Sequence, residues 1–123
     1  MKKILVVDDI EDYLSSLENA LKTEYKVLKA RSLEEAKAIA DKEDFSLAIV
    51  DIRLSEKDSS NKDGLVFLEW IKMNKPGIPV IVMSAYKEFD LAVEALNLGA
   101  EYFLKKPINL VELKGLLKTL LSK

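Results

Sequence analysis

Aspartate residues follow two of the most apolar runs in this chain. Asp8 and Asp9 come directly after the run at residues 4–7, and Asp51 follows the run at residues 47–50. Short, fully apolar runs are typical of strands that are buried on both faces of a parallel sheet. The carboxyl ends of such strands border the crevice in which these sheets bind ligands. We therefore expect the three carboxylates to meet at one acidic site.

An acidic site of this kind needs a positive charge, because neighbouring carboxylates repel one another. Mg²⁺ would supply it, since this ion binds about six oxygen atoms from carboxylates, water and phosphate. Two other strand ends add polar groups: Ser84 closes an apolar run, and Lys106 stands just before Pro107. Their hydroxyl and ammonium groups could hold a phosphoryl group on Asp51. Aspartate is a known phosphoryl acceptor, and such transfer depends mostly on positioning and charge neutralisation.

Each of these residues also has a plainer explanation when it is taken alone. An acidic pair after a strand is often only the start of a helix, where the helix dipole favours negative charge. Asp51 could begin a turn, Ser84 could cap a helix, and Lys106 could be a solvated side chain. What favours a shared site is the coincidence of all these groups at predicted strand ends.

Composition narrows the classes of function. The 123 residues include no histidine and no cysteine, which excludes imidazole ligands, a histidine base and thiol chemistry within this chain. A net charge of −2 gives no electrostatic reason to expect nucleic acid binding. No apolar run approaches the length of a membrane span, and the basic start at residues 2–3 is followed by too short a run for a secretory signal. We expect one cytoplasmic domain over residues 1–123.

The apolar periodicity predicts alternating strands and helices. Strands are expected at residues 4–7, 25–29, 45–51, 79–84 and 101–105, with a helix after each. Ser32 with Glu35, and Asn109 with Glu112, have the spacing of helix-capping boxes. Gly99 is placed to end the fourth helix in a left-handed conformation. This pattern predicts an α/β, flavodoxin-like fold: a doubly wound, five-stranded parallel sheet of order 2-1-3-4-5 with five helices.

The fourth helix has two candidate faces. Its core stripe is expected to contain Phe89, Ala92, Val93 and Leu96. A second apolar face, with Leu91, Ala95 and Leu98, would then point away from the core. That second face could contact a partner, or it could be ordinary packing at a helix end.

The strand-end motifs resemble those of the response-regulator receiver domain of two-component signalling, the CheY-like superfamily. The resemblance runs from residue 3 through the last helix. The matching residues are Ile4-Leu5-Val6-Val7-Asp8-Asp9, Ala48-Ile49-Val50-Asp51, Val82-Met83-Ser84-Ala85, Leu98-Gly99-Ala100 and Lys106-Pro107.

The resemblance implies a role for each site residue. Asp51 corresponds to the phosphoryl acceptor, Ser84 to the hydroxyl that moves toward the phosphoryl group, and Lys106, rather than Lys105, to the lysine that pairs with it. The Mg²⁺ ligands would be Asp9 directly, Asp8 largely through water, Asp51, and the backbone carbonyl of Arg53. The family also implies a cis peptide bond between Lys106 and Pro107, which an X-Pro bond permits.

Two features depart from the family pattern. Leu54-Ser55 stands where the family usually has Met-Pro, and Asp63-Gly64 comes several residues late, so the loop at residues 55–62 is longer. This loop carries Glu56, Lys57, Asp58 and Lys62; it is either a solvated surface loop or a segment that tunes partner access or phosphoryl lifetime. The family's switch aromatic corresponds to Phe103, which lacks a hydroxyl.

The resemblance implies a phosphorylation-activated signalling switch. Asp51 would accept a phosphoryl group from a sensor histidine kinase, a phosphotransfer protein or a small phosphodonor, in a Mg²⁺-dependent reaction. The loop at residues 84–86 would then shift, Phe103 would fill the vacated space, and the surface of the fourth helix, fifth strand and fifth helix would change. That surface would control an output domain or a partner, with transcription regulation as one output, and could pair with a second copy. No output domain is expected within residues 1–123, and no nucleic acid or membrane contact is expected for this domain.

The alternative is a pseudo-receiver that binds partners without phosphorylation. Such a protein would usually lack an acid or the lysine, and none is missing here. Two other classes fit less well. A flavin phosphate would be repelled by Asp8 and Asp9, and the chain has no glycine-rich phosphate loop. A phosphoaspartyl hydrolase would normally carry a second acid two residues after its nucleophile, where Arg53 stands. We therefore expect no enzymatic activity other than its own phosphorylation and dephosphorylation.

Overall fold

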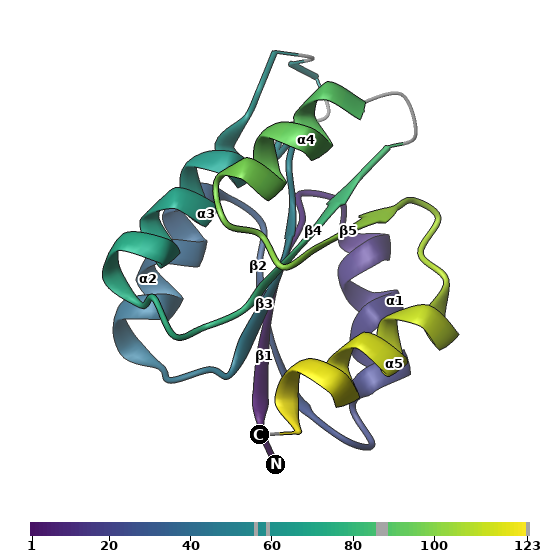
Figure 1. Cartoon of the computed structure of the whole chain (residues 1–123). Coiled ribbons are helices and arrows are strands. Elements are labelled where there is room, and N and C mark those ends of the chain that lie inside the picture. The colour runs from purple at the N-terminus through teal and green to yellow at the C-terminus, as the bar shows by residue number, and fades with distance from the viewer. Residues whose placement is uncertain (56, 59, 86–88, 123) are drawn as a thin grey trace.

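Strands and helices alternate along the chain in the computed structural model, which describes residues 1–55, 57–58, 60–85 and 89–122 and, of Phe89, only the backbone (Figure 1). The strands are β1 (Lys3–Val7), β2 (Lys26–Ala30), β3 (Leu47–Asp51), β4 (Val80–Ser84) and β5 (Tyr102–Lys105). The helices are α1 (Glu11–Leu21), α2 (Leu33–Lys42), α3 (Asp63–Asn74), α4 (Phe89–Asn97) and α5 (Leu110–Leu121). The predicted elements are confirmed, with strand ends that differ by one or two residues.

The strands form one parallel sheet of order β2-β1-β3-β4-β5, as predicted. The order reverses at β1, since β2 and β3 lie on either side of it. Val7 of β1 is paired with Val50 of β3, which places the residues that follow each of them side by side. The site residues therefore gather at the switch point of a doubly wound sheet, which is where this class of fold binds its ligands.

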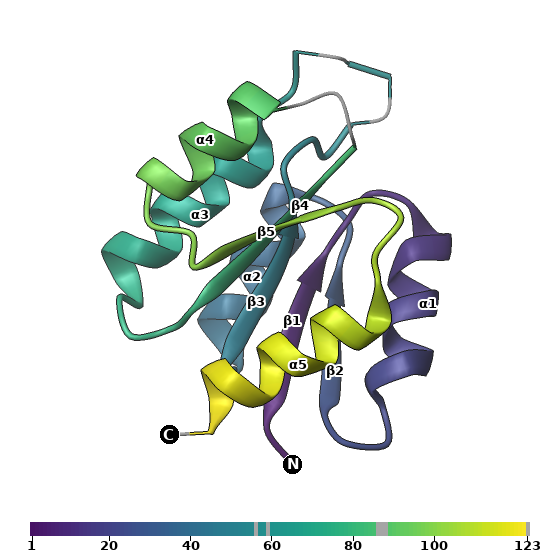
Figure 2. The same ribbon diagram turned by 45° about the vertical axis from the view of Figure 1, so that its right-hand side comes forward.

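Helices cover both faces of the sheet (Figures 1 and 2). One face carries α1 and α5, and the other carries α2, α3 and α4. Because successive side chains of a strand point to opposite faces, each central strand contributes to both cores. In β3, for example, Leu47 and Ile49 pack toward α1 and α5, whereas Ala48 and Val50 pack toward α2 and α3. Among the described residues, no helix is long and apolar enough to cross a bilayer.

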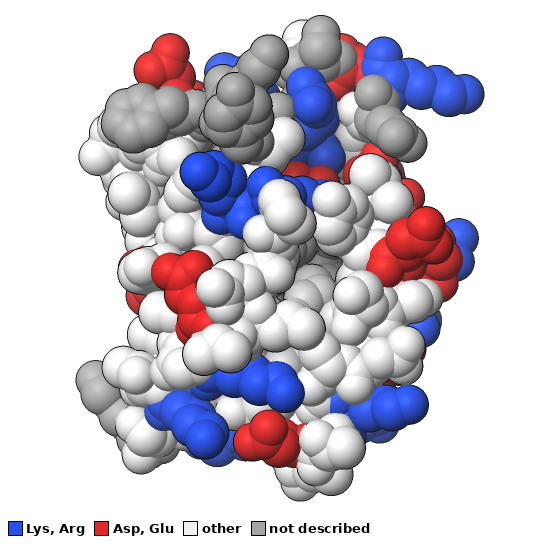
Figure 3. Space-filling model, turned by 90° about the vertical axis from the view of Figure 1, so that its right-hand side faces the viewer, with Lys and Arg blue, Asp and Glu red and all other residues white. Residues whose placement is uncertain are grey.

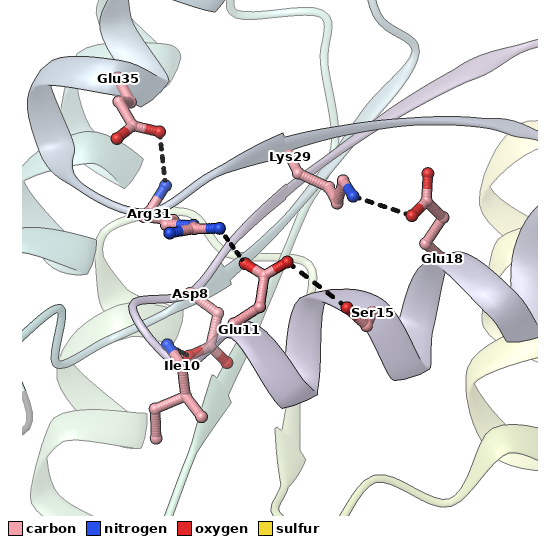
Figure 4. A network of polar contacts seen from close by, with 8 residues as sticks. All are labelled: Asp8, Ile10, Glu11, Ser15, Glu18, Lys29, Arg31 and Glu35. Atoms are coloured by element: carbon pink, nitrogen blue, oxygen red, sulfur yellow. Dashed lines mark hydrogen bonds and ion pairs between the residues drawn. The ribbon is translucent and has the colours of Figure 1, made fainter.

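Side-chain caps begin two of the helices. The Ser32 hydroxyl accepts a hydrogen bond from the Glu35 amide at 3.1 Å, and the Asn109 side chain accepts one from the Glu112 amide at 3.0 Å. The return bond expected from Glu35 to the Ser32 amide is not the one formed. The Glu35 carboxylate instead accepts from the Arg31 amide at 3.2 Å, and the Arg31 guanidinium pairs with Glu11 of α1 at 2.6 Å (Figure 4). The start of α2 is thereby joined to the start of α1.

The face of α4 that packs on the core differs from the predicted one. Leu91 and Leu98 pack against the core together with the buried Ala95, whereas Val93 and Leu96 are exposed. The buried stripe is thus shifted by about one residue. Of the predicted positions whose side chains the structure describes, Ala92 is buried, whereas Val93 and Leu96 are not. The sequence of α4 is apolar on most of its circumference, so periodicity alone could not select the face. The side chain of Phe89 lies outside the described residues.

Glu101 joins three elements at the end of the sheet opposite the aspartates. Its carboxylate accepts a hydrogen bond from the Val80 amide at 2.7 Å and pairs with Lys72 of α3 at 3.0 Å. The Glu101 amide in turn donates to the Val80 carbonyl at 2.9 Å. Gly99, just before it, has a φ of 106°, which confirms the predicted left-handed end of α4. The starts of β4 and β5 are therefore fixed to the end of α3.

Candidate functional site

The three aspartates predicted to meet do so at the carboxyl edge of the sheet. Asp8, Asp9 and Asp51 each offer a carboxylate oxygen, and these atoms all lie within 4.8 Å of one another. Asp8 and Asp51 are buried, and Asp9 is half-buried. A compact set of carboxylate oxygens is the donor set that a hard divalent cation such as Mg²⁺ prefers. The residues present therefore fit the predicted metal.

Lys106 supplies the positive charge that the structure places among these acids. Its ammonium group donates to Asp8 Oδ2 at 2.8 Å and to Asp51 Oδ2 at 3.1 Å. The side chain is only 9% exposed, whereas the neighbouring Lys105 is exposed on the surface. Of the two lysines, Lys106 is thus the one that reaches the site, as predicted. The peptide bond between Lys106 and Pro107 is cis, which confirms the expectation from the family.

Two carboxylates of the acidic cluster, those of Asp8 and Asp51, share the Lys106 ammonium. Burial raises the pKa of Asp51 to about 7; Lys106 acts in the opposite direction, and the charge of Asp8 adds to the rise. Burial also lowers the pKa of Lys106, but Asp51 and Asp8 outweigh this effect, so that its pKa lies above the usual value. Perturbed carboxylates of this kind cluster at functional sites.

Ser84 and Arg53 lie near the acidic cluster for different reasons: Ser84 ends the strand beside β3, and Arg53 follows Asp51 in the sequence. Ser84 ends β4, is fully buried, and is paired with Lys105 of β5, while its neighbour Met83 is paired with Asp51. The carbonyl of Ser84 accepts a hydrogen bond from the Lys106 amide at 2.8 Å, which fixes the backbone of Lys106. Arg53 is half-buried, two residues after Asp51. The structure thus brings the predicted site residues to one edge of the sheet. Figure 3 shows a face of the molecule on which acidic atoms lie recessed beneath basic side chains.

Gly64 allows α3 to begin directly against the end of β3. Its amide donates to the Ile52 carbonyl at 2.8 Å, and a Cβ atom at this position would lie 2.0 Å from the carbonyl oxygen of Asp51. Only glycine can approach the backbone so closely. Gly64 therefore sets the path of the chain immediately after Asp51.

The longer loop at residues 55–62 is anchored at its end by Asn61. The Asn61 side-chain oxygen accepts hydrogen bonds from the amides of Leu54 and Asp63, both at 2.9 Å. Lys62 pairs with Glu94 of α4 at 3.6 Å, so the loop contacts α4 as well as the end of β3. Glu56 of this loop and Tyr86 of the loop at residues 84–86 lie outside the described residues.

Phe103, predicted to be the switch aromatic, is half-buried and packs against the core on the side of α3 and α4. Tyr102 points the other way: it is largely exposed, and its hydroxyl donates to Glu112 of α5 at 3.3 Å. The assignment of the inward aromatic to Phe103 rather than Tyr102 agrees with this placement. Any movement of the Phe103 ring would depend on packing, because Phe103 has no hydroxyl.

Sequence analysis missed one side chain at the site. The ring of Tyr13, in the first turn of α1, lies under the Lys106 ammonium, 3.9 Å from it to the ring centroid. Nothing in the local sequence marks Tyr13, since it stands next to the apolar Leu14 in a helix and is far from Lys106 along the chain. Only the folded arrangement of α1 and the segment after β5 brings the two together.

A doubly wound parallel sheet of order 2-1-3-4-5 defines the flavodoxin-like class of α/β domains. Within that class, the chain belongs to the response regulator receiver domain family, whose model matches residues 4–118. Receiver domains of this family carry phosphorylation-dependent signalling, act as switches rather than as true enzymes, and interact with histidine kinases or other phosphodonors. They bind Mg²⁺ through acidic residues.

Curated relatives are bacterial regulators. The response regulator protein PilR of Pseudomonas aeruginosa is 35% identical over 121 residues, which are 98% of this chain and 26% of that protein. The transcriptional regulatory protein ZraR of Escherichia coli is 36% identical over 120 residues, 97% of this chain and 26% of that protein. The chain therefore spans about a quarter of the length of these relatives.

Solved structures show the same fold. The receiver domain protein (CheY-like) of Methanospirillum hungatei has a TM-score of 0.87 at 32% identity, with 99% of this chain and 94% of that chain covered. The receiver domain of NtrX from Brucella abortus has a TM-score of 0.83 at 30% identity, with 98% of both chains covered. Both similarities extend over nearly the whole of this chain.

Proposed function

We propose that this chain is one receiver domain, residues 1–123, that is switched by phosphorylation of Asp51. The observation that carries the proposal is the placement of one buried lysine, Lys106, against Asp51 and Asp8 at the switch point of the sheet. A carboxylate that accepts a phosphoryl group needs a cation beside it, because negative charge is concentrated on the phosphoryl oxygen atoms during the transfer. The phosphoryl donor would be a sensor histidine kinase, a phosphotransfer protein or a small phosphodonor.

The reaction can be written from the residues of this site. A carboxylate oxygen of Asp51 attacks the phosphorus atom, a new O–P bond forms, and the bond between phosphorus and the donor breaks. The leaving group departs with the electron pair of that bond. Lys106, already within hydrogen-bonding distance of Asp51, pairs with a phosphoryl oxygen. The Ser84 hydroxyl moves toward another phosphoryl oxygen.

Asp8, Asp9, Asp51 and the backbone carbonyl of Arg53 are the proposed ligands of Mg²⁺. The ion, when bound, neutralises charge on the carboxylates and on the phosphoryl oxygens. The three carboxylates are the part of this set that the described structure places within one cluster. Asp9 would bind directly and Asp8 largely through water.

Incubation with acetyl phosphate tests the proposal. In the presence of Mg²⁺, intact-protein mass spectrometry is expected to show a gain of one phosphoryl group on the wild-type chain. The gain should disappear with EDTA and in Asp51→Asn, because the amide is not a nucleophile of comparable strength. Asp58→Asn is the matched control, since Asp58 is an exposed aspartate of the neighbouring loop. A wild-type chain that gains no mass would favour the pseudo-receiver, which binds its partners without phosphorylation.

Signal output is proposed to pass through α4, β5 and α5. Phosphorylation adds charge and strong hydrogen-bond acceptors at Asp51, which biases two arrangements of these elements. The printed name of one relative, transcriptional regulatory protein, supports regulation of transcription as an output, which would lie outside the described domain. The proposed location of the domain is the cytoplasm. The proposal assigns no contact with nucleic acid or membrane to this domain.

Exposed apolar side chains on α4 make a second copy of this chain a candidate partner. Val93 and Leu96 are 41% and 48% exposed, and Tyr102 of β5 is 39% exposed. Size-exclusion chromatography with Mg²⁺ and beryllofluoride, a phosphoryl mimic, is expected to show a dimer that Leu96→Glu abolishes. A wild-type chain that elutes as an unchanged monomer would contradict phosphorylation-driven dimerisation.

A further inference from the structure

The ring of Tyr13 forms one wall of the position that Lys106 occupies. The Lys106 ammonium carries three N–H donors. Asp8 and Asp51 accept two hydrogen bonds from it, and the face of the Tyr13 ring lies 3.9 Å below it. An aromatic face is electron-rich and attracts a cation, more strongly where water is excluded. The 9% exposure of the Lys106 side chain means that most of its water is excluded here.

Hydrogen bonds near Asp8 hold the backbone that carries the ring. Asp8 Oδ1 accepts a hydrogen bond from the Ile10 amide at 3.0 Å, and the Ile10 carbonyl accepts one from the Tyr13 amide at 3.1 Å. The other oxygen of Asp8 accepts from Lys106. Asp8, the first turn of α1, the Tyr13 ring and Lys106 thus form a closed set of contacts. A substitution of Tyr13 would therefore change the position of the Lys106 ammonium as well as the local packing.

A long lysine side chain has many rotamers, and restricting them costs free energy that another group must offset. The two carboxylates cannot fix the ammonium alone once a phosphoryl group or a metal ion competes for their oxygens. The ring of Tyr13 is not a ligand of either, so its attraction persists when the carboxylate partners change. It is the neighbour best suited to keep Lys106 at the site during the reaction.

We propose that Tyr13 is a positioning residue, whose ring face holds the Lys106 ammonium beside Asp51 for phosphoryl transfer. The proposal rests on the proposed function for the transfer step, but the contact between Tyr13 and Lys106 can be measured without it. Tyr13 itself touches no reacting atom in this account. Its effect is exerted through Lys106.

Two substitutions distinguish the effect of the aromatic face of Tyr13 from the effect of its size. Tyr13→Phe keeps the aromatic face, and Tyr13→Leu keeps an apolar side chain of moderate size without one. With Mg²⁺ and acetyl phosphate, the limiting phosphorylation rate is expected to fall about fivefold to tenfold in Tyr13→Leu and to stay within about twofold of wild type in Tyr13→Phe. Mg²⁺ affinity should change by less than about twofold in both, because Tyr13 is not among the proposed ligands. A parallel loss of Mg²⁺ affinity in Tyr13→Leu would overturn the proposal, since the acidic cluster itself would then be disturbed.

NMR spectroscopy of the unphosphorylated protein measures the contact directly. The ring current of Tyr13 is expected to shift the Lys106 Hε resonances upfield in wild type and Tyr13→Phe, and this shift should be lost in Tyr13→Leu. A trifluorinated phenylalanine at position 13 keeps the shape of the ring and weakens the negative charge of its face. This variant tests the proposal even if Tyr13→Leu does not fold. Its limiting phosphorylation rate should be lower than that of Tyr13→Phe.

The outcomes distinguish this proposal from the proposed function. A wild-type chain that is never phosphorylated refutes phosphorylation at Asp51, while the NMR shift still reports on Tyr13 and Lys106. A phosphorylated wild type whose rate equals that of both the leucine and the fluorinated variants refutes the positioning role. The absence of any upfield shift in the wild type refutes it as well.

Discussion

Replacing Gly64 by alanine is expected to destabilise the domain by about 3 kcal/mol or more, a cost at the upper end of that known for inserted core methyl groups. The added Cβ would lie 2.0 Å from the Asp51 carbonyl oxygen and 2.6 Å from the Cα atom of Ile52. Both are backbone atoms, so no side chain can rotate away to make room. The start of α3 would have to move off the end of β3. Urea unfolding followed by circular dichroism measures the change in free energy.

Gly115 provides the matched control for this substitution. It lies in the interior of α5, and a Cβ atom there would meet no atom within 4 Å. Gly115→Ala is therefore expected to stabilise the domain by about 0.5–1 kcal/mol, because alanine loses less backbone entropy on folding. Equal unfolding free energies for the two variants would contradict the close approach of α3 to Asp51.

Asp51→Asn is expected to make the metal-free domain more stable at pH 8, by up to about 4 kcal/mol. Burial raises the pKa of Asp51 in the folded protein to about 7, from an ordinary value of 3.8. A raised carboxyl pKa means that the folded chain binds a proton that the unfolded chain has already released. The stability from this group is therefore fully present below the unfolded pKa and is lost as the pH rises through about 7. Asparagine removes the loss, because it carries no charge at any of these pH values.

The sign of this prediction is checked by its pH dependence. The advantage of Asp51→Asn should shrink to about 1 kcal/mol at pH 4.5, where the wild-type carboxyl is protonated in the folded state. Mg²⁺ at pH 8 should reduce the advantage as well, since a ligand that binds the folded wild type stabilises it. Asp44→Asn, at an exposed position between α2 and β3, should change stability by less than about 0.5 kcal/mol at either pH. An Asp51→Asn variant less stable than wild type at pH 8 would show that the pairing with Lys106 outweighs burial.

The sequence carried enough information to predict the sheet and the acids at its edge. Both follow from local patterns: apolar runs that end in Asp9 or Asp51, and the cap spacing of Ser32 and Asn109. Parallel strands must present their carboxyl ends at one edge, so knowing the strand order was sufficient to bring Asp8, Asp9 and Asp51 together. The family resemblance then selected Lys106 over Lys105, and the structure places Lys106 within the site.

Features that depend on the packing of separate segments were not predictable. The face of α4 was misplaced because Val93 and Leu96 are as apolar as Leu91 and Leu98, and only contact with the sheet, at β4 and β5, decides between them. The ring of Tyr13 reaches Lys106 across a long separation in sequence, for which no periodicity gives a signal. The Glu35 carboxylate accepts from the Arg31 amide instead of the Ser32 amide, and residue spacing does not distinguish these two neighbouring donors.

The carboxylate of Glu101 ties together one end of the sheet. It binds the first amide of β4 and Lys72 at the end of α3, far from the aspartates. At the opposite end, the strands lead into the loops that carry the site. We therefore expect a displacement that starts near Asp51 to be larger at the Ser84 end of β4 than at its Val80 end, because the Val80 end is held by Glu101 and, through it, by Lys72.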